Sequence, residues 1–336
     1  MNVKAAMNAI SCIQKADSST LTLMVRQIRF EAVGINSYEF VDPDGGELPP
    51  FTPGSHIDVH LGSGLVRQYS LCNPPSERHR YVVAVLKEEG GGRGGSRRLH
   101  ETLHVQDRIK VSVPRNHFEL AADGKYNVLI GGGIGITPLM AMAHALDDAG
   151  INFELHYCAK ASEYAAFKEE MAALNKDGRV RYHFDGIDPA KHLNVAKLLS
   201  QYTQGTHVYY CGPSGFMAAC AAAAEHWPSG TVHSEHFKPT EQPKHRPDDL
   251  GTAYVEIAST GQKFEIPSHK SLADALNELG IEVPTSCVSG LCGTCKVRYL
   301  KGEVDHHDYI LSEDERASCL TTCVSRPKSG VLVLDL

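Results

Sequence analysis

The first third of the chain alternates apolar and polar residues with a period of two. This alternation is typical of strands with one buried face, and the segments between them are rich in Gly, Pro, Asp and Asn, which favour turns. One short helix is expected near residues 96–103. We therefore predict an antiparallel β-barrel. Its strands are predicted at residues 21–30, 56–62, 65–73, 81–89 and 108–114.

The middle of the chain, from about residue 125 to 237, changes to an alternation of apolar strands and helices. Four strand–helix pairs followed by a fifth strand are typical of a parallel sheet covered on both faces. The strands are predicted at residues 126–130, 153–159, 180–184, 207–212 and 231–237. The helices are predicted after the glycine turn near residue 131, at 163–175, at 194–202 and from near Gly215.

One segment, residues 128–146, contains no Lys, Arg, Asp or Glu and has the length of a membrane span. Its four glycines, its Thr137-Pro138 pair and His144 favour a buried strand, a turn and a helix instead. We expect no membrane association. The N-terminus lacks the apolar h-region of a secretory signal, so we expect a cytoplasmic and reducing location.

Charge and composition narrow the classes of partner. The chain has 33 Lys and Arg against 40 Asp and Glu, a net charge of −7, which argues against nucleic acid as the partner. Residues 238–250 contain three prolines and mixed charge, as interdomain linkers do. The block that follows, 251–336, has 8 basic and 12 acidic residues and therefore carries −4 of the −7.

Five of the ten cysteines lie in the last 50 residues. Cys287, Cys292 and Cys295 have the spacing C-x4-C-x2-C, and both Cys319 and Cys323 could supply a fourth thiolate. This arrangement is that of a plant-type [2Fe–2S] cluster. A zinc site made of Cys292, Cys295, Cys319 and Cys323 is the rival interpretation, but it leaves Cys287 without a role. A Rieske centre is excluded in this chain, because no cysteine is followed two positions later by His.

Residues 131–138, GGGIGITP, follow a predicted strand and begin a helix. Backbone N–H groups at such a turn favour an anion such as a pyrophosphate. The sequence does not match G-x-G-x-x-G, and no G-K-[ST] follows, so a merely tight strand–helix connection is the alternative. Cys211-Gly212-Pro213 ends another strand of the same sheet, at the edge where open α/β sheets bind ligands.

The barrel contains a candidate flavin site. Arg67-Gln68-Tyr69-Ser70 ends a predicted strand, and the glycine-rich residues 90–97 begin the short helix. An aromatic ring, a hydroxyl, an arginine and amides at a helix N-terminus suit flavin mononucleotide. The structural alternatives are Tyr69 as barrel core, Arg67 as a surface charge and the glycines as a loop.

Five motifs in this order resemble the phthalate dioxygenase reductase family, which includes vanillate O-demethylase reductases. They are RQYSLCN, GRGGS, GGIGITP, YYCGP and CVSGLCGTC, within a resemblance that covers about residues 20–336. The resemblance implies three domains on one chain, together with an N-terminal extension (1–20) and a linker (238–250). These domains are a six-stranded flavin-binding β-barrel (21–122), an α/β parallel-sheet nicotinamide domain (123–237) and an α+β, β-grasp plant-type ferredoxin domain (251–336).

The resemblance also implies a role for each candidate residue. For FMN it implies Arg67, Gln68, Tyr69, Ser70, Val85, Leu86, Gly94, Gly95, Ser96 and Phe237. For NADH it implies Gly132, Gly133, Ile134, Gly135, Thr137, Pro138, Cys211, Gly212 and Pro213. Ser70 and Cys211 would be the catalytic residues. The x4, x2, x27 spacing matches the family and favours Cys323 over Cys319, which gives the ligand set Cys287, Cys292, Cys295 and Cys323.

Two features depart from the family pattern. The family commonly has an aromatic residue at the position of Ser234, and residues 1–20 have no counterpart. Lys160, after the second strand of the nicotinamide domain, could contact a 2′-phosphate, but NADPH-selective proteins often use Arg there, so NADH is favoured.

The expected function follows from the cofactors. NADH gives two electrons, a [2Fe–2S] cluster accepts one, and a flavin can stand between them. The resemblance implies a monomeric reductase that supplies a Rieske-type terminal oxygenase acting on phthalate, a related aromatic acid or a methyl ether. The acidic ferredoxin block would dock on a basic patch of that oxygenase. The alternatives are a stand-alone flavin reductase, a redox-sensing iron–sulfur flavoprotein and a non-catalytic electron-transfer scaffold.

Overall fold

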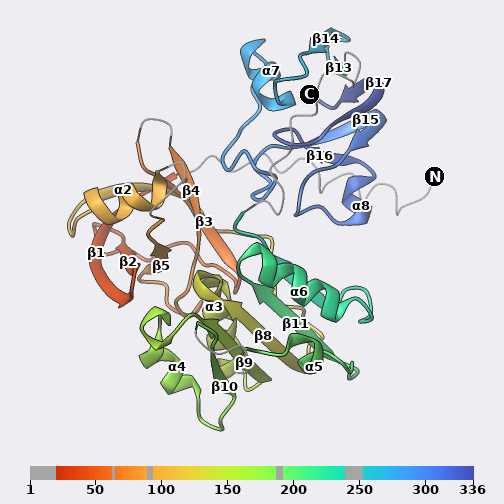
Figure 1. Ribbon diagram of the computed structural model, residues 1–336. Helices are drawn as coiled ribbons and strands as arrows, with labels where there is room; N and C mark the ends of the chain where they lie inside the picture. The colour runs from red at the N-terminus through yellow and green to blue at the C-terminus, as the bar shows by residue number, and fades with distance from the viewer. Residues whose placement is uncertain (1–19, 63–64, 89–93, 187–191, 239–252) are drawn as a thin grey trace. The chain divides into compact units, whose positions relative to one another are not determined.

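The computed structural model describes residues 20–62, 65–88, 94–186, 192–238 and 253–336 (Figure 1). Contacts divide these residues into a first unit that ends at Phe237 and a second unit within Lys238–Leu336. The predicted extension and linker lie almost wholly outside the described residues, as do residues 90–93 of the glycine-rich segment. No helix in the described ranges is both long and apolar enough to cross a membrane.

The first unit begins with the expected antiparallel barrel. Its six main strands run in the order β4-β3-β6-β1-β2-β5, and the short β7 pairs with β3. A bridge between Leu71 and Val83 joins the two end strands and closes the barrel. The elements are β1 (Thr20–Ala32), β2 (Ile35–Val41), β3 (Ser55–His60), β4 (Val66–Ser70), β5 (Tyr81–Leu86), α2 (Gly95–Thr102), β6 (Arg108–Ser112) and β7 (Arg115–Asn116).

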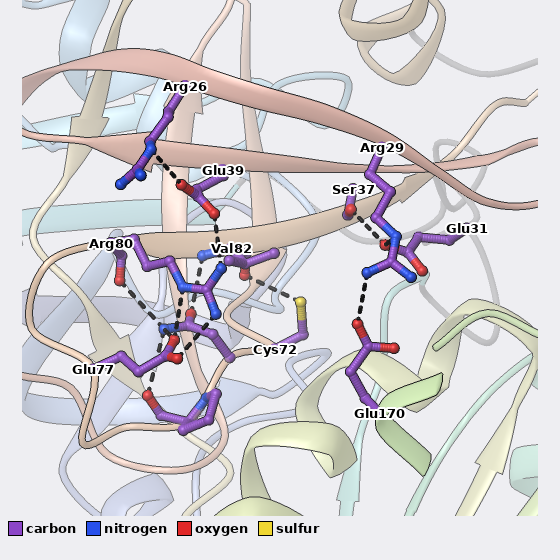
Figure 2. A network of polar contacts seen from close by, with 12 residues as sticks. Arg26, Arg29, Glu31, Ser37, Glu39, Cys72, Glu77, Arg80, Val82 and Glu170 are labelled. Atoms are coloured by element: carbon purple, nitrogen blue, oxygen red, sulfur yellow. Dashed lines mark hydrogen bonds and ion pairs between the residues drawn. The ribbon is translucent and has the colours of Figure 1, made fainter. Parts of the chain in front are cut away.

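Strand β2 lies outside the five segments predicted from the alternation of apolar and polar residues. Its polar residues Ser37 and Glu39 are buried, so they do not mark a solvent face. Ser37 donates a 2.6 Å hydrogen bond to Glu31, and Glu39 forms a 2.7 Å ion pair with Arg80 (Figure 2). Buried polar groups need such partners, and the partners come from other strands and turns, which a local pattern does not reveal.

The second half of the first unit is a parallel sheet in the order β10-β9-β8-β11-β12. Alternate strand residues serve its two faces: Leu129, Leu155 and Tyr209 pack on the side of α3 and α4, and Val128, Ile130 and Val208 on the side of α5 and α6 (Figure 1). The elements are β8 (Tyr126–Gly132), η2 (Gly133–Gly135), α3 (Ile136–Asp148), β9 (Asn152–Ala159), η3 (Ser162–Tyr164), α4 (Lys168–Leu174), β10 (Val180–Phe184), α5 (Val195–Leu198), β11 (Thr206–Cys211), α6 (Ser214–Ala224) and β12 (Val232–Glu235).

Two helices of this sheet are shorter than predicted. The helix expected at 163–175 is replaced at its start by the 3₁₀ turn η3 and by Ala165, Ala166 and Phe167, which are all buried. The Ala166 amide donates a 3.1 Å hydrogen bond to the Tyr157 hydroxyl, and Phe167 has φ at 57°. The helix therefore does not extend back through this stretch, and α4 begins after Phe167. The helix expected at 194–202 is the single turn α5, capped by the side chain of Asn194.

The barrel and the parallel sheet share one interface. Ala32, Ile35, Cys72 and Ala84 of the barrel belong to the same hydrophobic cluster as α3. Polar contacts flank it: Arg29 on β1 forms ion pairs of 2.8 Å with Glu169 and 3.0 Å with Glu170 of α4. Figure 2 shows the Arg29–Glu170 pair. The flavin and nucleotide halves of the first unit are thus packed as one body.

The second unit is a mixed sheet of the β-grasp type in the order β14-β13-β17-β15-β16. Strands β13 and β17 are parallel, and the other pairs are antiparallel. Helix α7 packs Leu272, Ala273 and Leu276 into its core. The elements are β13 (Ala253–Ile257), β14 (Lys263–Ile266), α7 (Leu272–Glu278), β15 (Lys296–Asp305), α8 (Glu313–Arg316), β16 (Cys319–Thr321) and β17 (Arg326–Leu334).

Candidate functional site

Arg67 and the N-terminus of α2 come together on the barrel. A Cβ atom on Gly95 would lie 2.5 Å from Cγ of Arg67, so the arginine stem crosses the first turn of the helix where only glycine fits. Gly94, the N-cap residue, has φ at 78°, supplies no side-chain cap, and the first turn contains no acidic residue. The guanidinium of Arg67 donates a 2.7 Å hydrogen bond to the carbonyl of Val66. It lies beside the amides of this turn, which is the arrangement that the sequence predicted for the FMN phosphate.

The neighbours of Arg67 on β4 point to both sides of the strand. Tyr69 packs partly buried against the barrel core, and burial raises its pKa. The Gln68 side chain donates a 2.7 Å hydrogen bond to Asp58, which also pairs with Arg115 at 2.6 Å. Burial opposes ionisation of Asp58, but Arg115 and Gln68 together hold its pKa below the ordinary value. The Gln68 side chain thus has a structural partner within the barrel.

Of the two β5 residues predicted to line the flavin, one side chain is buried and the other is exposed. Val85 is 1% exposed and belongs to the barrel core, and Leu86 is 38% exposed. Because successive strand residues face opposite sides, the two side chains cannot present one continuous surface. The carbonyl of Val85 is in hydrogen-bond contact with the ring of His100 on α2 at 2.8 Å, which ties this strand to the helix that carries the anion site.

Ser70 at the end of β4 meets the carboxyl edge of the parallel sheet. Its hydroxyl donates a 3.3 Å hydrogen bond to Glu235 at the end of β12. Glu235 is the register partner of Cys211 at the end of β11. Burial raises the pKa of Glu235 to about 8, and the hydrogen bond from Ser70 partly opposes this; burial and then Glu235 raise the pKa of Cys211. The two residues predicted as catalytic are therefore joined through a third.

Sequence reasoning missed Glu235. A signal was available, because the parallel sheet predicted from the sequence places the ends of its adjacent strands side by side. The prediction instead named Phe237, two residues further on, which is 37% exposed. Ser234, the departure from the family pattern, lies on β12 between His233 and Glu235, opposite Tyr210.

The glycine turn after β8 packs closely against the end of β11, at positions where a side chain would not fit. A Cβ on Gly135 would lie 2.2 Å from the carbonyl oxygen of Cys211, and one on Gly132 would lie 3.0 Å from Pro213. The turn therefore touches the Cys211-Gly212-Pro213 segment, and Gly133 has φ at 54°, in the region that favours glycine. Thr137 donates back to the carbonyl of Ile134 at 3.1 Å. Helix α3 has neither a side-chain cap nor an acidic first turn, so its N-terminus can accept a pyrophosphate.

In the second unit the four predicted ligands converge. Cys287, Cys292 and Cys295 are 2–3% exposed, and Cys323 is half-buried. The thiol of Cys287 is hydrogen-bonded with those of Cys292 and Cys323, and the thiol of Cys295 with that of Cys323. The backbone amides of Ser289 and Leu291 donate to Sγ of Cys287, each at 3.4 Å. Contacts with these thiols and amides lower the pKa of Cys287 despite its burial. Four cysteine thiols that converge in this way suit an iron–sulfur cluster.

Cys319 lies apart from this group. It is fully buried on β16 and packs with Ile310 and Leu311, whereas Cys295 and Cys323 belong to a different cluster. Among the residues described, no group of three or more His, Cys, Asp and Glu side chains is arranged to hold a single metal ion. Gly290 and Gly293 have φ at 71° and 68°, in the region that favours glycine, so the loop bends sharply at both.

Family models match two parts of the chain. The model described as an oxidoreductase NAD-binding domain matches residues 129–222. The model described as a 2Fe-2S iron-sulfur cluster binding domain matches residues 255–328. These matches confirm the nicotinamide and iron–sulfur cofactors, and they confirm that the chain is an oxidoreductase.

Curated relatives cover nearly the whole chain. A tert-butanol monooxygenase / tert-amyl alcohol desaturase reductase subunit from Aquincola tertiaricarbonis is 52% identical over 98% of this chain and 100% of its own. A vanillate O-demethylase oxidoreductase from Pseudomonas sp. (strain HR199 / DSM 7063) is 43% identical over 94% and 100%. A phthalate dioxygenase reductase from Burkholderia cepacia is 40% identical over 89% and 92%.

Solved structures share the architecture. A phthalate dioxygenase reductase, described as a modular structure for electron transfer from pyridine nucleotides to [2Fe–2S], matches with a TM-score of 0.70 and 38% identity over 95% of this chain and 99% of its own. An intact type IV self-sufficient cytochrome P450 monooxygenase matches with a TM-score of 0.87 and 36% identity over 94% of this chain and 41% of its own. This fold supports FMN as the flavin. The chain therefore belongs to the phthalate dioxygenase reductase family.

Proposed function

We propose that the chain is the NADH-dependent reductase component of a two-component oxygenase. It would take electrons from NADH through FMN and deliver them singly through its [2Fe–2S] cluster to a terminal oxygenase on a separate chain. The observation that carries the proposal is the contact of Ser70 with Glu235, beside Cys211. It joins the flavin-type barrel to the carboxyl edge of the nucleotide-type sheet, where one cofactor can meet the other.

Different residues of the first unit would bind FMN and NADH. Arg67, with the amides at Gly95 and Ser96, would hold the FMN phosphate. The glycine turn 132–138 and the N-terminus of α3 would hold the NADH pyrophosphate. Bound FMN supplies the exchange between a two-electron donor and a one-electron acceptor. Ser70 and the largely neutral Glu235 carboxyl would keep the region between the flavin and the nicotinamide polar but uncharged at neutral pH. The packed interface between barrel and parallel sheet would hold the two binding sites at a fixed separation.

The cluster ligands would be Cys287, Cys292, Cys295 and Cys323. Support comes from their convergence and from the two backbone amides aimed at Sγ of Cys287. Cys319 would lie outside the ligand set, because its sulfur is already in a disulfide bond. A Cys323 thiolate is the chemically consistent fourth ligand, because its thiol already contacts the thiols of Cys287 and Cys295.

The acceptor would be a Rieske-type oxygenase that acts on phthalate, a related aromatic acid or a methyl ether, and the reductase would be a cytoplasmic monomer. The curated relatives support an oxygenase partner, since they are named as reductases of a monooxygenase, an O-demethylase and a dioxygenase. The cytochrome P450 match carries this architecture together with its own oxygenase on one chain, so a haem oxygenase is the competing acceptor.

The test is anaerobic titration followed by turnover. NADH should bleach the flavin absorbance and then the cluster absorbance of the purified chain, and the reduced chain should support product formation by a Rieske oxygenase encoded beside its gene. A flavin that NADH fails to bleach would sink the proposal. Rapid reduction of ferricyanide that survives loss of the cluster, with no oxygenase supported, would favour a stand-alone flavin reductase.

A further inference from the structure

One peptide group in the cluster-binding loop is held on both sides. The carbonyl oxygen of Gly290 accepts a 3.1 Å hydrogen bond from the backbone amide of Tyr309. The amide of Leu291, which belongs to the same peptide group, donates to Sγ of Cys287 at 3.4 Å. A carbonyl that accepts a hydrogen bond polarises its own peptide and strengthens the N–H as a donor. Tyr309 therefore acts on Cys287 through the Gly290–Leu291 peptide.

Asp308, the residue before Tyr309, fixes the segment that supplies this contact. Its carboxylate accepts a 2.9 Å hydrogen bond from the amide of Leu311 and lies 3.5 Å from both Arg316 and His306. Arg316 also donates to the carbonyl of Asp308 at 2.9 Å. The Asp308 side chain has no exposed surface. A carboxylate is costly to bury without such partners, so these contacts hold Asp308 and the backbone on either side of it in place.

The backbone of His307 and Asp308 packs directly against Gly290 in the cluster-binding loop. A Cβ on Gly290 would lie 3.0 Å from Cα of Asp308, 3.2 Å from the carbonyl oxygen of His307 and 2.8 Å from the side chain of Val324, next to Cys323. Gly290 also has φ at 71°. The loop peptide has no room to rotate while Asp308 is in place, so its N–H stays aimed at the sulfur.

We propose that Asp308 is a positioning residue for the cluster: it holds the Tyr309 amide against Gly290, keeps the Leu291 N–H on Sγ of Cys287, and thereby raises the reduction potential of the cluster. Hydrogen bonds to ligating sulfurs stabilise the more negative, reduced cluster. Loss of one such bond therefore moves the potential downwards. The inference rests on the proposed ligand set, because it requires Cys287 to bind iron.

The sign of the change in reduction potential distinguishes a positioning role of Asp308 from the effect of its charge alone. Removal of a buried carboxylate would by itself make the surroundings more positive and move the potential upwards. In the full-length chain we expect Asp308→Ala to move it downwards, by a three- to tenfold change in the ratio of reduced to oxidised cluster at fixed ambient potential. A tenfold change corresponds to about 59 mV for a one-electron couple. Asp308→Asn loses the charge but keeps an acceptor oxygen for Leu311, so its potential should lie above that of Asp308→Ala.

The experiment combines redox titration with EPR of the reduced cluster. In pulsed EPR, the coupling of an exchangeable proton to the cluster should weaken in Asp308→Ala. Asp335→Asn is the matched control, because it removes a carboxylate from another arginine pair of the same unit, 3.7 Å from Arg298; its exchangeable-proton coupling should be that of the wild type, and its potential should not fall.

Each outcome is decisive. An unchanged or higher potential in loaded Asp308→Ala would overturn the inference. If that variant binds no cluster, Asp308→Glu decides: it keeps the charge but displaces the carboxylate from the Leu311 amide, so its potential should fall, and an unchanged or higher potential would overturn the inference. A wild-type chain without a [2Fe–2S] spectrum, or a Cys287→Ser chain that keeps a normal one, would instead defeat the ligand assignment of the proposed function.

Discussion

The hydroxyl of Ser70 lies 3.3 Å from the carboxyl group of Glu235, although 165 residues separate them in the sequence. Ser70 ends a barrel strand, and Glu235 ends the last strand of the parallel sheet. The contact therefore closes the gap between the predicted flavin site and the predicted nicotinamide site. It also gives the site a titratable group, because burial raises the pKa of Glu235 to about 8.

Glu235→Gln should remove a pH dependence from flavin reduction. Below pH 8 the wild-type carboxyl is largely neutral, and above it a buried negative charge opposes the arrival of negative charge on the flavin. We expect the wild-type rate to fall between pH 7 and 9, and the variant to match the wild type at pH 7 and stay level. Anaerobic stopped-flow reduction by NADH measures this.

A Ser70→Ala chain provides the complementary check. The hydrogen bond from Ser70 favours the carboxylate and so lowers the pKa of Glu235, and its loss should move the midpoint of the rate profile to higher pH. A Glu235→Gln rate more than tenfold below the wild type at pH 7 would contradict the expectation and would assign the carboxyl itself to the chemistry.

Gly95→Ala should weaken FMN binding. The added Cβ would lie 2.5 Å from Cγ of Arg67, so the guanidinium must leave the helix N-terminus. Hydrogen bonds to a charged group contribute about 1.5–3 kcal/mol, so the dissociation constant of FMN should rise about tenfold or more. Fluorescence titration of the apoprotein with FMN measures it. Gly215→Ala, where a Cβ meets nothing within 4 Å, should bind FMN as the wild type does, and equal losses in both variants would point to general destabilisation.

Cysteine variants should separate the two candidate fourth ligands. Cys292→Ser and Cys323→Ser should lose the visible absorbance and the iron of the cluster, because each removes one of four converging thiolates. Both should still show flavin bleaching by NADH. Cys319→Ser should keep the cluster, since Cys319 packs with Ile310 and Leu311. Iron analysis and absorbance spectra decide the matter, and a cluster lost from Cys319→Ser but kept in Cys323→Ser would reverse the assignment.

His233 should make the first unit sensitive to acid. Its ring stacks on Tyr209 at 4.5 Å and contacts His207 at 3.0 Å. Burial, and then His207, lower its pKa from 6.5 to about 4. The folded state thus resists protonation that the unfolded state accepts, so stability is fully present above pH 6.5 and falls as the pH drops towards 4.

The size of this loss should be about 1–2 kcal/mol, reduced from the full effect because solvent screens the partly exposed ring. Urea unfolding of the wild type and of His233→Gln at pH 7.5 and 5.0 tests it. The variant should lose less stability than the wild type over this range. Parallel curves for the two chains would show that another group is responsible.

The sequence was most informative where chemistry is local. The strand–glycine turn–helix at 126–148 and the spacing of Cys287, Cys292 and Cys295 depend on neighbours within a few residues, and both are present in the fold. Local pattern failed where the decisive partner is remote. The buried polar residues of β2 are paired with Glu31 and Arg80. The residues before α4 are buried in the same cluster as barrel residues. Glu235 is part of the candidate site because Ser70 donates a hydrogen bond to it.

The apolar interface formed by Ala32, Ile35, Cys72 and Ala84 has a consequence for protein engineering. These residues share one hydrophobic core with Leu139 and Met142 of α3. Separating the barrel from the parallel sheet would therefore expose apolar surface on both fragments. A chimaera that replaces only the barrel must therefore repack a foreign core. A chimaera joined after Phe237 exchanges a whole ferredoxin and leaves this core intact. For the residues that the structure describes, the junction after Phe237 is therefore a place where one unit can be exchanged without repacking the core of the other.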